Sequence, residues 1–255
     1  MNRLGTSRPK GLTAQGLRLW GFLFLLAGMV GKGILLNRVL QVQQYTGQEL
    51  VELLKSHTQG LLMLALVLQA LEACAAPIFA FLLVEGFRYT TNHGRYILRV
   101  FGLAVVSEIP YNLCMSGTVW ANESRNPMFA MAICLVLLYF YKMQEDRGFG
   151  GAVFQVMISV MAALSVMSLG VPDGLPLVAL VLILWVLRWK EKRIPVGAVV
   201  SLFCATLNPL YIVAPLGFLF IHFYNEEEDC VNRWMKYLTY PILLLAVWAV
   251  SLLAS

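Results

Sequence analysis

Apolar runs of membrane-spanning length recur along almost the whole chain, and short polar or basic turns separate them. The runs cover residues 18–36, 60–87, 96–114, 127–143, 150–170, 173–189, 194–208, 209–224 and 235–254. A helix needs about 20 mostly apolar residues to cross the hydrocarbon core of a bilayer. The pattern therefore predicts an all-α, polytopic bundle of about eight or nine transmembrane helices.

The number of spans depends on the two short runs that meet at Asn208 and Pro209. They are either two separate spans or one broken helix or re-entrant hairpin that does not cross the bilayer. Losing one span would move the C-terminus to the other side of the membrane. Before these runs, the long polar loop 39–58 has leucines at spacings that predict an amphipathic helix lying on the membrane surface.

Composition agrees with the membrane interpretation and excludes a soluble domain. The chain is 59% hydrophobic and 13% charged, with a mean hydropathy of +0.73, which leaves too little polar surface for a soluble fold. A net charge of +5 would suit a nucleic-acid ligand. However, the basic residues lie mainly in the short turns between the runs, where they mark topology. We expect the lipid bilayer as a partner and no nucleic acid.

The distribution of positive charge predicts the orientation of the chain. With the N-terminus in the cytoplasm, most of the 19 Lys and Arg residues fall on the cytoplasmic side, as the positive-inside rule requires. The exceptions, on or near the outer side, are Lys32, Arg38, Lys55 and Arg125. Residues 1–17 then form a cytoplasmic segment, and residues 18–254 form one transmembrane domain.

Two glutamates interrupt apolar runs and are the first candidates for chemistry. Glu85 ends the run that starts at Pro77, and Glu108 precedes Pro110 inside the next run. Ionisable groups at such depth are costly and usually mark functional sites. The structural alternatives are a helix-end carboxylate at Glu85, held by Arg88 or Arg95, and a hydrogen-bonded packing acid at Glu108.

Helical spacing limits how these groups can meet. Arg99 and Glu108 are nine residues apart, which places them on opposite sides of an ideal helix at about 180°. We therefore expect Arg99 to meet Glu85 or phosphate groups at the cytoplasmic rim. Glu72, a third acid in an apolar run, lies about 140° around from Glu85 if one helix joins them. One site would need at least two neighbouring helices.

Other common sites are absent from the sequence. Asn126 and Asp173 both precede apolar runs and have a simple interpretation as helix starts. The three histidines are scattered without metal-ligand spacing, and the five cysteines form no CxxC, so we predict no metal. The chain has no Walker loop, dinucleotide fingerprint or GxSxG elbow.

Several motifs resemble the TraX family of bacterial integral membrane proteins, over residues 17–250. The motifs are PIFAFLLVEGF at 77–87, RYILR at 95–99, SEIPY at 107–111, NPMF at 126–129 and YP at 240–241. The family is named for a conjugation-plasmid protein that N-acetylates the amino terminus of F-pilin. The resemblance implies a multi-pass protein of the bacterial cytoplasmic membrane and a membrane acetyltransferase.

The resemblance also implies a donor, an acceptor and residue roles. Acetyl-CoA would be the donor, and a pilin-like peptide or another surface group would be the acceptor. Glu85 or Glu108 would serve as the general base. Arg99, with Arg95 and Arg88, would bind the phosphates of the donor at the cytoplasmic rim.

The chain departs from the family pattern at several polar positions. An Asp-His pair, an Arg, two further His and an Asp are replaced by Gly28, Met29, Ala73, Tyr89, Leu243 and Asn112. Tyr89, Asn112 and Asn126 remain as polar candidates. Because histidine is the usual base in acyl transfer, a second hypothesis is a non-catalytic relative that binds a membrane partner or serves as a scaffold. A proton-coupled transporter is a third, although no internal repeat supports it.

Overall fold

The computed structural model describes residues 11–45, 59–121, 125–145, 147–225 and 233–253. Within these ranges the regular structure is helical, apart from one isolated bridge between Leu12 and Tyr224. The prediction of an all-α chain is therefore confirmed. The predicted surface helix in loop 39–58 falls mostly on residues 46–58, which lie outside the described residues.

The helices follow one another along the chain with short connections. The first half contains α1 (Ala14–Met29), its π-helical continuation η1 (Val30–Val39), η2 (Val42–Gln44), α3 (Gln59–Glu72), α4 (Ala75–Tyr89) and α5 (His93–Ser116). The second half contains α6 (Met128–Met143), α7 (Gly148–Ser168), α8 (Gly174–Val186), α9 (Arg193–Phe203), η3 (Cys204–Thr206), η4 (Pro209–Val213), α10 (Pro215–His222) and α11 (Arg233–Leu253).

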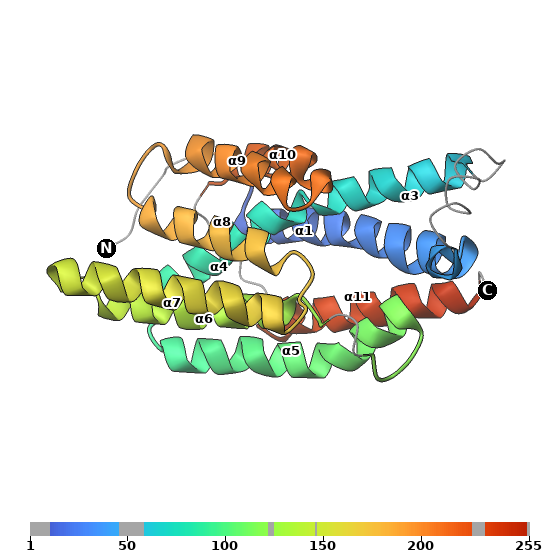
Figure 1. Cartoon of the computed structure of the whole chain (residues 1–255), viewed down its shortest axis with the longest axis horizontal. Coiled ribbons are helices and arrows are strands. Elements are labelled where there is room, and N and C mark those ends of the chain that lie inside the picture. The colour runs from blue at the N-terminus through green and yellow to red at the C-terminus, as the bar shows by residue number, and fades with distance from the viewer. Residues whose placement is uncertain (1–10, 46–58, 122–124, 146, 226–232, 254–255) are drawn as a thin grey trace, which may run out of the picture.

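The long helices lie side by side along the long axis of the molecule (Figure 1). We call the end that carries residues 89–93, 143–145, 147–148 and 186–193 the basic end; it lies at the left of Figure 1. Four helical stretches are long and apolar enough to cross a membrane: Ala14–Val39, Gln59–Tyr89, His93–Ser116 and Gly148–Ser168. Shorter apolar helices pack among them, as expected for a multi-pass membrane bundle.

The predicted span 60–87 is interrupted in its middle. Pro77 has no N–H to donate to the carbonyl of Ala73, and its ring disfavours a continuous helix, so α3 ends and α4 begins here. The Sγ of Cys74 donates to the carbonyl of Val213 at 3.3 Å. Gly217 lets α10 approach this break, because a Cβ there would lie 2.5 Å from the carbonyl oxygen of Cys74.

The predicted runs 194–208 and 209–224 form a helical hairpin. α9 has 11 residues, so it is only about 17 Å long, well short of the roughly 30 Å hydrocarbon core. The chain turns at Asn208, whose side chain accepts a hydrogen bond from the backbone N–H of Leu210 at 3.1 Å. α9 and α10 then pack against each other (Figure 1), and Gly197 makes room for the ring of Phe218.

Two large apolar clusters form most of the core, and a third, small one consists of Ala73, Cys204, Tyr211 and Ala214. The larger one joins α4, α6 and α8 through fully buried residues such as Val84, Leu135 and Leu180. The smaller one joins the first helix, α5 and α11 through Met29, Tyr111 and Leu244, among others. In contrast, α7 presents large apolar side chains outward, which is the pattern of a helix that faces lipid.

Candidate functional site

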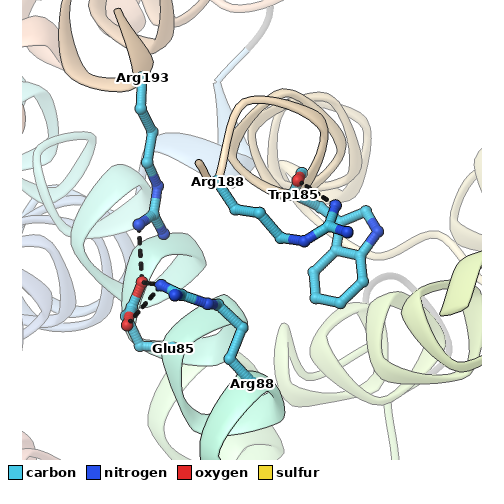
Figure 2. Close-up of polar contacts among 5 residues, drawn as sticks. All are labelled: Glu85, Arg88, Trp185, Arg188 and Arg193. Atoms are coloured by element: carbon cyan, nitrogen blue, oxygen red, sulfur yellow. Dashed lines mark hydrogen bonds and ion pairs between the residues drawn. The ribbon is translucent and has the colours of Figure 1, made fainter. Parts of the chain in front are cut away.

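Glu85 is buried at the basic end and is paired with two arginines (Figure 2). The Nη1 of Arg88 donates to both of its carboxylate oxygens, at 2.9 and 3.1 Å. The Nη1 of Arg193 donates to Oε1 at 2.6 Å. Arg88 was one of the partners expected from the sequence, together with Arg95 and Arg99. Arg193 was not foreseen, because it begins α9 and is 108 residues away in the chain.

Two tryptophans extend this arrangement. The guanidinium of Arg88 lies over the ring of Trp189, 4.4 Å from its centroid. The guanidinium of Arg188 lies 4.1 Å from the ring centroid of Trp185, donates to the Trp185 carbonyl at 2.9 Å and pairs with Glu145. We call Arg88, Arg188, Arg193, Trp185 and Trp189 the arginine–tryptophan cluster.

The other basic residues expected at this site lie apart from it. Arg95 and Arg99 are exposed on α5, and within the described part of the chain neither forms an ion pair with Glu85. The expected meeting of Arg99 with Glu85 is therefore not seen, because Glu85 faces α9 and Arg99 faces outward. Tyr89 is 67% exposed, with the Arg88 guanidinium 5.5 Å from its ring centroid.

Glu108 belongs to a different group of contacts. One carboxylate oxygen accepts a hydrogen bond from the backbone N–H of Asn126 at 3.1 Å, and the other pairs with Nη1 of Arg125 at 3.2 Å. Its side chain is 15% exposed. Glu108, on α5, thereby holds residues 125–126, which precede α6, against α5. This is the role of the packing acid that the sequence left as an alternative.

Asn126 is buried and fully engaged at the centre of the same group. Its Oδ1 accepts from the backbone N–H of Met128 at 3.0 Å and from the hydroxyl of Tyr240 at 2.9 Å. The predicted helix-start role of Asn126 is confirmed by the first of these bonds. The second ties α6 to α11. Asn112, also buried, donates through Nδ2 to the carbonyl of Val119 at 3.3 Å.

Glu85 and Glu108 do not form one site. Glu85 lies in the last turns of α4 at the basic end, whereas Glu108 lies fifteen residues beyond His93, where α5 begins. A helix of that length rises by about 22 Å. The two carboxylates are therefore too far apart to act on the same small group.

A cavity of about 280 Å³ lies deeper in the bundle, around the point where α3 ends. Its apolar wall includes Met29, Ala73, Phe79 and Leu177. The polar groups that line it are Lys32, Gln69, Glu72, Tyr111, Asp173, Asn208, Tyr211 and Tyr240. Such a mixture of apolar wall and a few polar groups is typical of ligand sites.

Glu72 is the carboxylate of this cavity that has no partner among the described residues: no hydrogen bond or ion pair holds it there. Asp173, by contrast, accepts a hydrogen bond from Nδ2 of Asn208 at 3.0 Å. Close by, Nε2 of Gln69 is buried without a partner within the described ranges. The sequence identified Glu72 as an acid in an apolar run but not as a site residue. The nearby Pro77, which breaks the helix, was the available signal.

The cavity also gathers several of the positions that the motif resemblance marks as departures. Met29 and Ala73 line it. Gly28 faces the Glu72 carboxylate so closely that an added Cβ would overlap it. Leu243 packs against the same apolar cluster as Met29. Of the replaced positions, Tyr89 lies at the basic end, away from the others.

The described residues contain no group of three or more His, Cys, Asp or Glu that could hold a metal ion. The cysteines in these ranges, Cys74, Cys114, Cys134 and Cys204, are free and buried. They act as small core residues.

Comparison with known proteins agrees with the motifs. The family model described as TraX protein matches residues 49–251. No curated protein and no solved structure matches the chain. The family match covers most of the chain, from α3 to almost the end of α11, and it includes Glu72 and the cavity residues that follow it in the chain. The chain therefore belongs to the TraX family.

Proposed function

We propose that this protein is a membrane acetyltransferase and that the cavity around Glu72 is its reaction site. The observation that supports this is the unpaired Glu72 carboxylate, which stands beside the positions where the TraX pattern carries Asp, His and Arg. The donor would be acetyl-CoA. The acceptor would be an amine or hydroxyl of a pilin-like peptide or another surface molecule.

Acetyl transfer needs a group that accepts a proton from the attacking atom. The acceptor nitrogen or oxygen attacks the thioester carbonyl, a C–N or C–O bond forms, and the C–S bond breaks. The proton passes to the Glu72 carboxylate and then to the departing thiolate. Lys32 lines the same cavity and supplies positive charge for the oxyanion that develops.

We assign the base to Glu72 instead of Glu85 or Glu108 because of their contacts. Glu85 is neutralised by two arginines, and Glu108 is held by Arg125 and a backbone N–H. The Glu85 and Glu108 carboxylates are thus occupied by other groups, whereas Glu72 has no partner among the described residues. In this proposal the basic end faces the cytoplasm, as the positive-inside rule predicts. Acetyl-CoA would therefore reach the cavity from that side of the membrane.

The test is transfer of radiolabelled acetyl from acetyl-CoA to proteins and peptides in inside-out vesicles from cells that express the chain. We expect Glu72→Gln to abolish the incorporation while the protein keeps its elution volume and unfolding temperature. Glu191→Gln is the matched control, because it makes the same change in an exposed carboxylate outside the cavity and should leave the incorporation unchanged. Full activity in Glu72→Gln would exclude Glu72 as the base.

A non-catalytic role is the second candidate. It is favoured by Met29 and Ala73, which leave the cavity without a lining histidine among the described residues. Calorimetry of the wild type in nanodiscs with acetyl-CoA, using CoA and ADP as comparators, separates the two functions. Saturable binding of acetyl-CoA agrees with transfer. No heat at millimolar donor from folded protein would favour a partner-binding protein.

A further inference from the structure

Two polar turns border the Glu72 cavity near the middle of the molecule. One joins α7 to α8 and carries Asp173, and the other joins α9 to α10 and carries Asn208; both residues line the cavity. Nδ2 of Asn208 donates to Asp173 at 3.0 Å, which holds the two turns together. In Figure 1, α7 to α10 stop at these turns, whereas α3 and α11 extend to the end of the molecule opposite the basic end. We call this opposite end the far end.

The lipid-facing surface of the molecule continues past these turns toward the far end. On α3, Leu64 and Val67 lie between the far end and Glu72, and both are large, apolar and exposed. On α11, Tyr240 lines the cavity, and exposed Val250 follows ten residues later, about 15 Å nearer the far end. Exposed apolar surface of this extent marks contact with the membrane. The two turns therefore lie within the hydrocarbon depth and not at its surface.

Polar turns at this depth require water. Non-helical backbone and charged side chains occur at membrane depth where protein buries them or where they line a water-filled cavity. Asp173 is exposed. Lys32, which lines the same cavity from η1, is half-buried and has no partner within the described ranges. Because protein does not cover these two charges, water is needed beside both of them.

The lining of the cavity indicates the side from which this water enters. Lys32 lies on the part of the first helix that leads to the far end, and Asp173 and Asn208 lie in turns that face the far end. Toward the basic end, the lining includes Ala130 and Leu177, which belong to the larger apolar cluster. The charged and hydrated wall of the cavity is thus the one that faces the far end.

We propose that a water-filled vestibule leads from the far end to the Glu72 cavity and that a polar ligand enters the cavity through it. Asp173 lies at the rim of this vestibule, and Lys32 lies inside it. The identity of the ligand rests on the proposed function: in acetyl transfer it is the acceptor, so acceptor and donor reach Glu72 from opposite sides. The vestibule itself does not depend on acetyl transfer.

Introduced cysteines test the vestibule without any need for transferase activity. Asp173→Cys and Lys32→Cys place a thiol at the rim and inside. Val67→Cys is the matched control, because Val67 is 57% exposed on α3 and does not line the cavity. Each variant also carries Cys230→Ser, because the other four cysteines are buried. The reagent is a membrane-impermeant sulfonated methanethiosulfonate, which reacts with thiolates and therefore needs a thiol in contact with water.

Labelling is compared in intact spheroplasts and in inside-out vesicles, and Trp120→Cys and Arg147→Cys report the far end and the basic end. We expect Asp173→Cys and Lys32→Cys to react from the side that labels Trp120→Cys, at least about tenfold faster than Val67→Cys.

The proposal is overturned if Lys32→Cys reacts no faster than Val67→Cys, or if it reacts from the side that labels Arg147→Cys. Elution volume and unfolding temperature establish that each variant is folded. If Asp173→Cys does not fold, Lys32→Cys alone decides. A protein that shows the expected labelling but transfers no acetyl keeps the vestibule and loses the proposed function, so the two proposals fail separately.

Discussion

The carboxylate of Glu72 occupies the space that any side chain at position 28 would need. A Cβ added to Gly28 would overlap the Glu72 side chain, and both residues lie next to the cavity of about 280 Å³. An acid from α3 thus stands beside Gly28, where the resemblance to the TraX family implies an acid from the first span. This relationship connects the departure at Gly28 to the proposed base.

We predict that Gly28→Ala destabilises the protein. The new methyl group forces the Glu72 carboxylate to move, and overpacking of this kind costs about 1–3 kcal/mol. Thermal unfolding in detergent measures the loss. Glu72→Ala in the same chain should restore most of it, since the obstructing side chain is then gone. Gly102→Ala is the control, because a Cβ at Gly102 meets nothing within 4 Å.

Glu85→Gln should lower the stability of the protein. The variant leaves Arg88 and Arg193 buried without a counter-ion, and breaking a buried ion pair costs about 3–5 kcal/mol. Unfolding temperature and yield report this change. Glu145→Gln breaks an ion pair whose carboxylate side chain is 38% exposed, so its effect should be small. Equal stability of Glu85→Gln and wild type would show that the pairing is not structural.

Substitutions at Glu108 should distinguish a packing acid from a base. Glu108→Ala removes the acceptor of the Asn126 N–H and the partner of Arg125, at an expected cost of about 1–3 kcal/mol. Glu108→Gln should cost less, because its amide oxygen can still accept the Asn126 N–H. Thermal unfolding and acetyl transfer are measured together. Loss of transfer in a fully stable Glu108→Gln protein would instead make Glu108 the base.

Accessibility of introduced cysteines should reveal the orientation. Trp120, 76% exposed, lies beyond the end of α5, and Arg147 is exposed at the basic end. In spheroplasts, a membrane-impermeant maleimide should label Trp120→Cys directly and Arg147→Cys only after lysis, because the basic end is predicted to be cytoplasmic. Both variants are made in a protein that also carries Cys230→Ser, because the other four cysteines are buried. The reverse pattern of labelling would invert the topology.

The helices themselves could be found from the sequence with good accuracy. The run 96–114 became α5 (His93–Ser116), and the run 150–170 became α7 (Gly148–Ser168). An apolar run of this length is a local property, and it suffices to define a helix in a membrane. The break at Ala73 was not foreseen, because it depends on how α10 packs against it as well as on Pro77.

The same break explains why the angle of about 140° expected between Glu72 and Glu85 does not describe their positions. The calculation assumed one continuous helix, whereas α3 ends at Glu72 and α4 begins at Ala75. Helical periodicity holds only within a helix. Glu72 thereby lines the cavity, while Glu85 meets arginines at the basic end.

The sequence by itself determined the class of the protein: an apolar helical bundle, the basic turns and the TraX motifs are all properties of consecutive residues. It also offered Arg88, three residues from Glu85 on the same helix, as one of the possible partners of that carboxylate. Only the tertiary structure decided that Arg193 completes this pair and that Glu72 remains unpaired in a cavity. Helices distant in the chain supply these neighbours, and only their packing determines which charges meet.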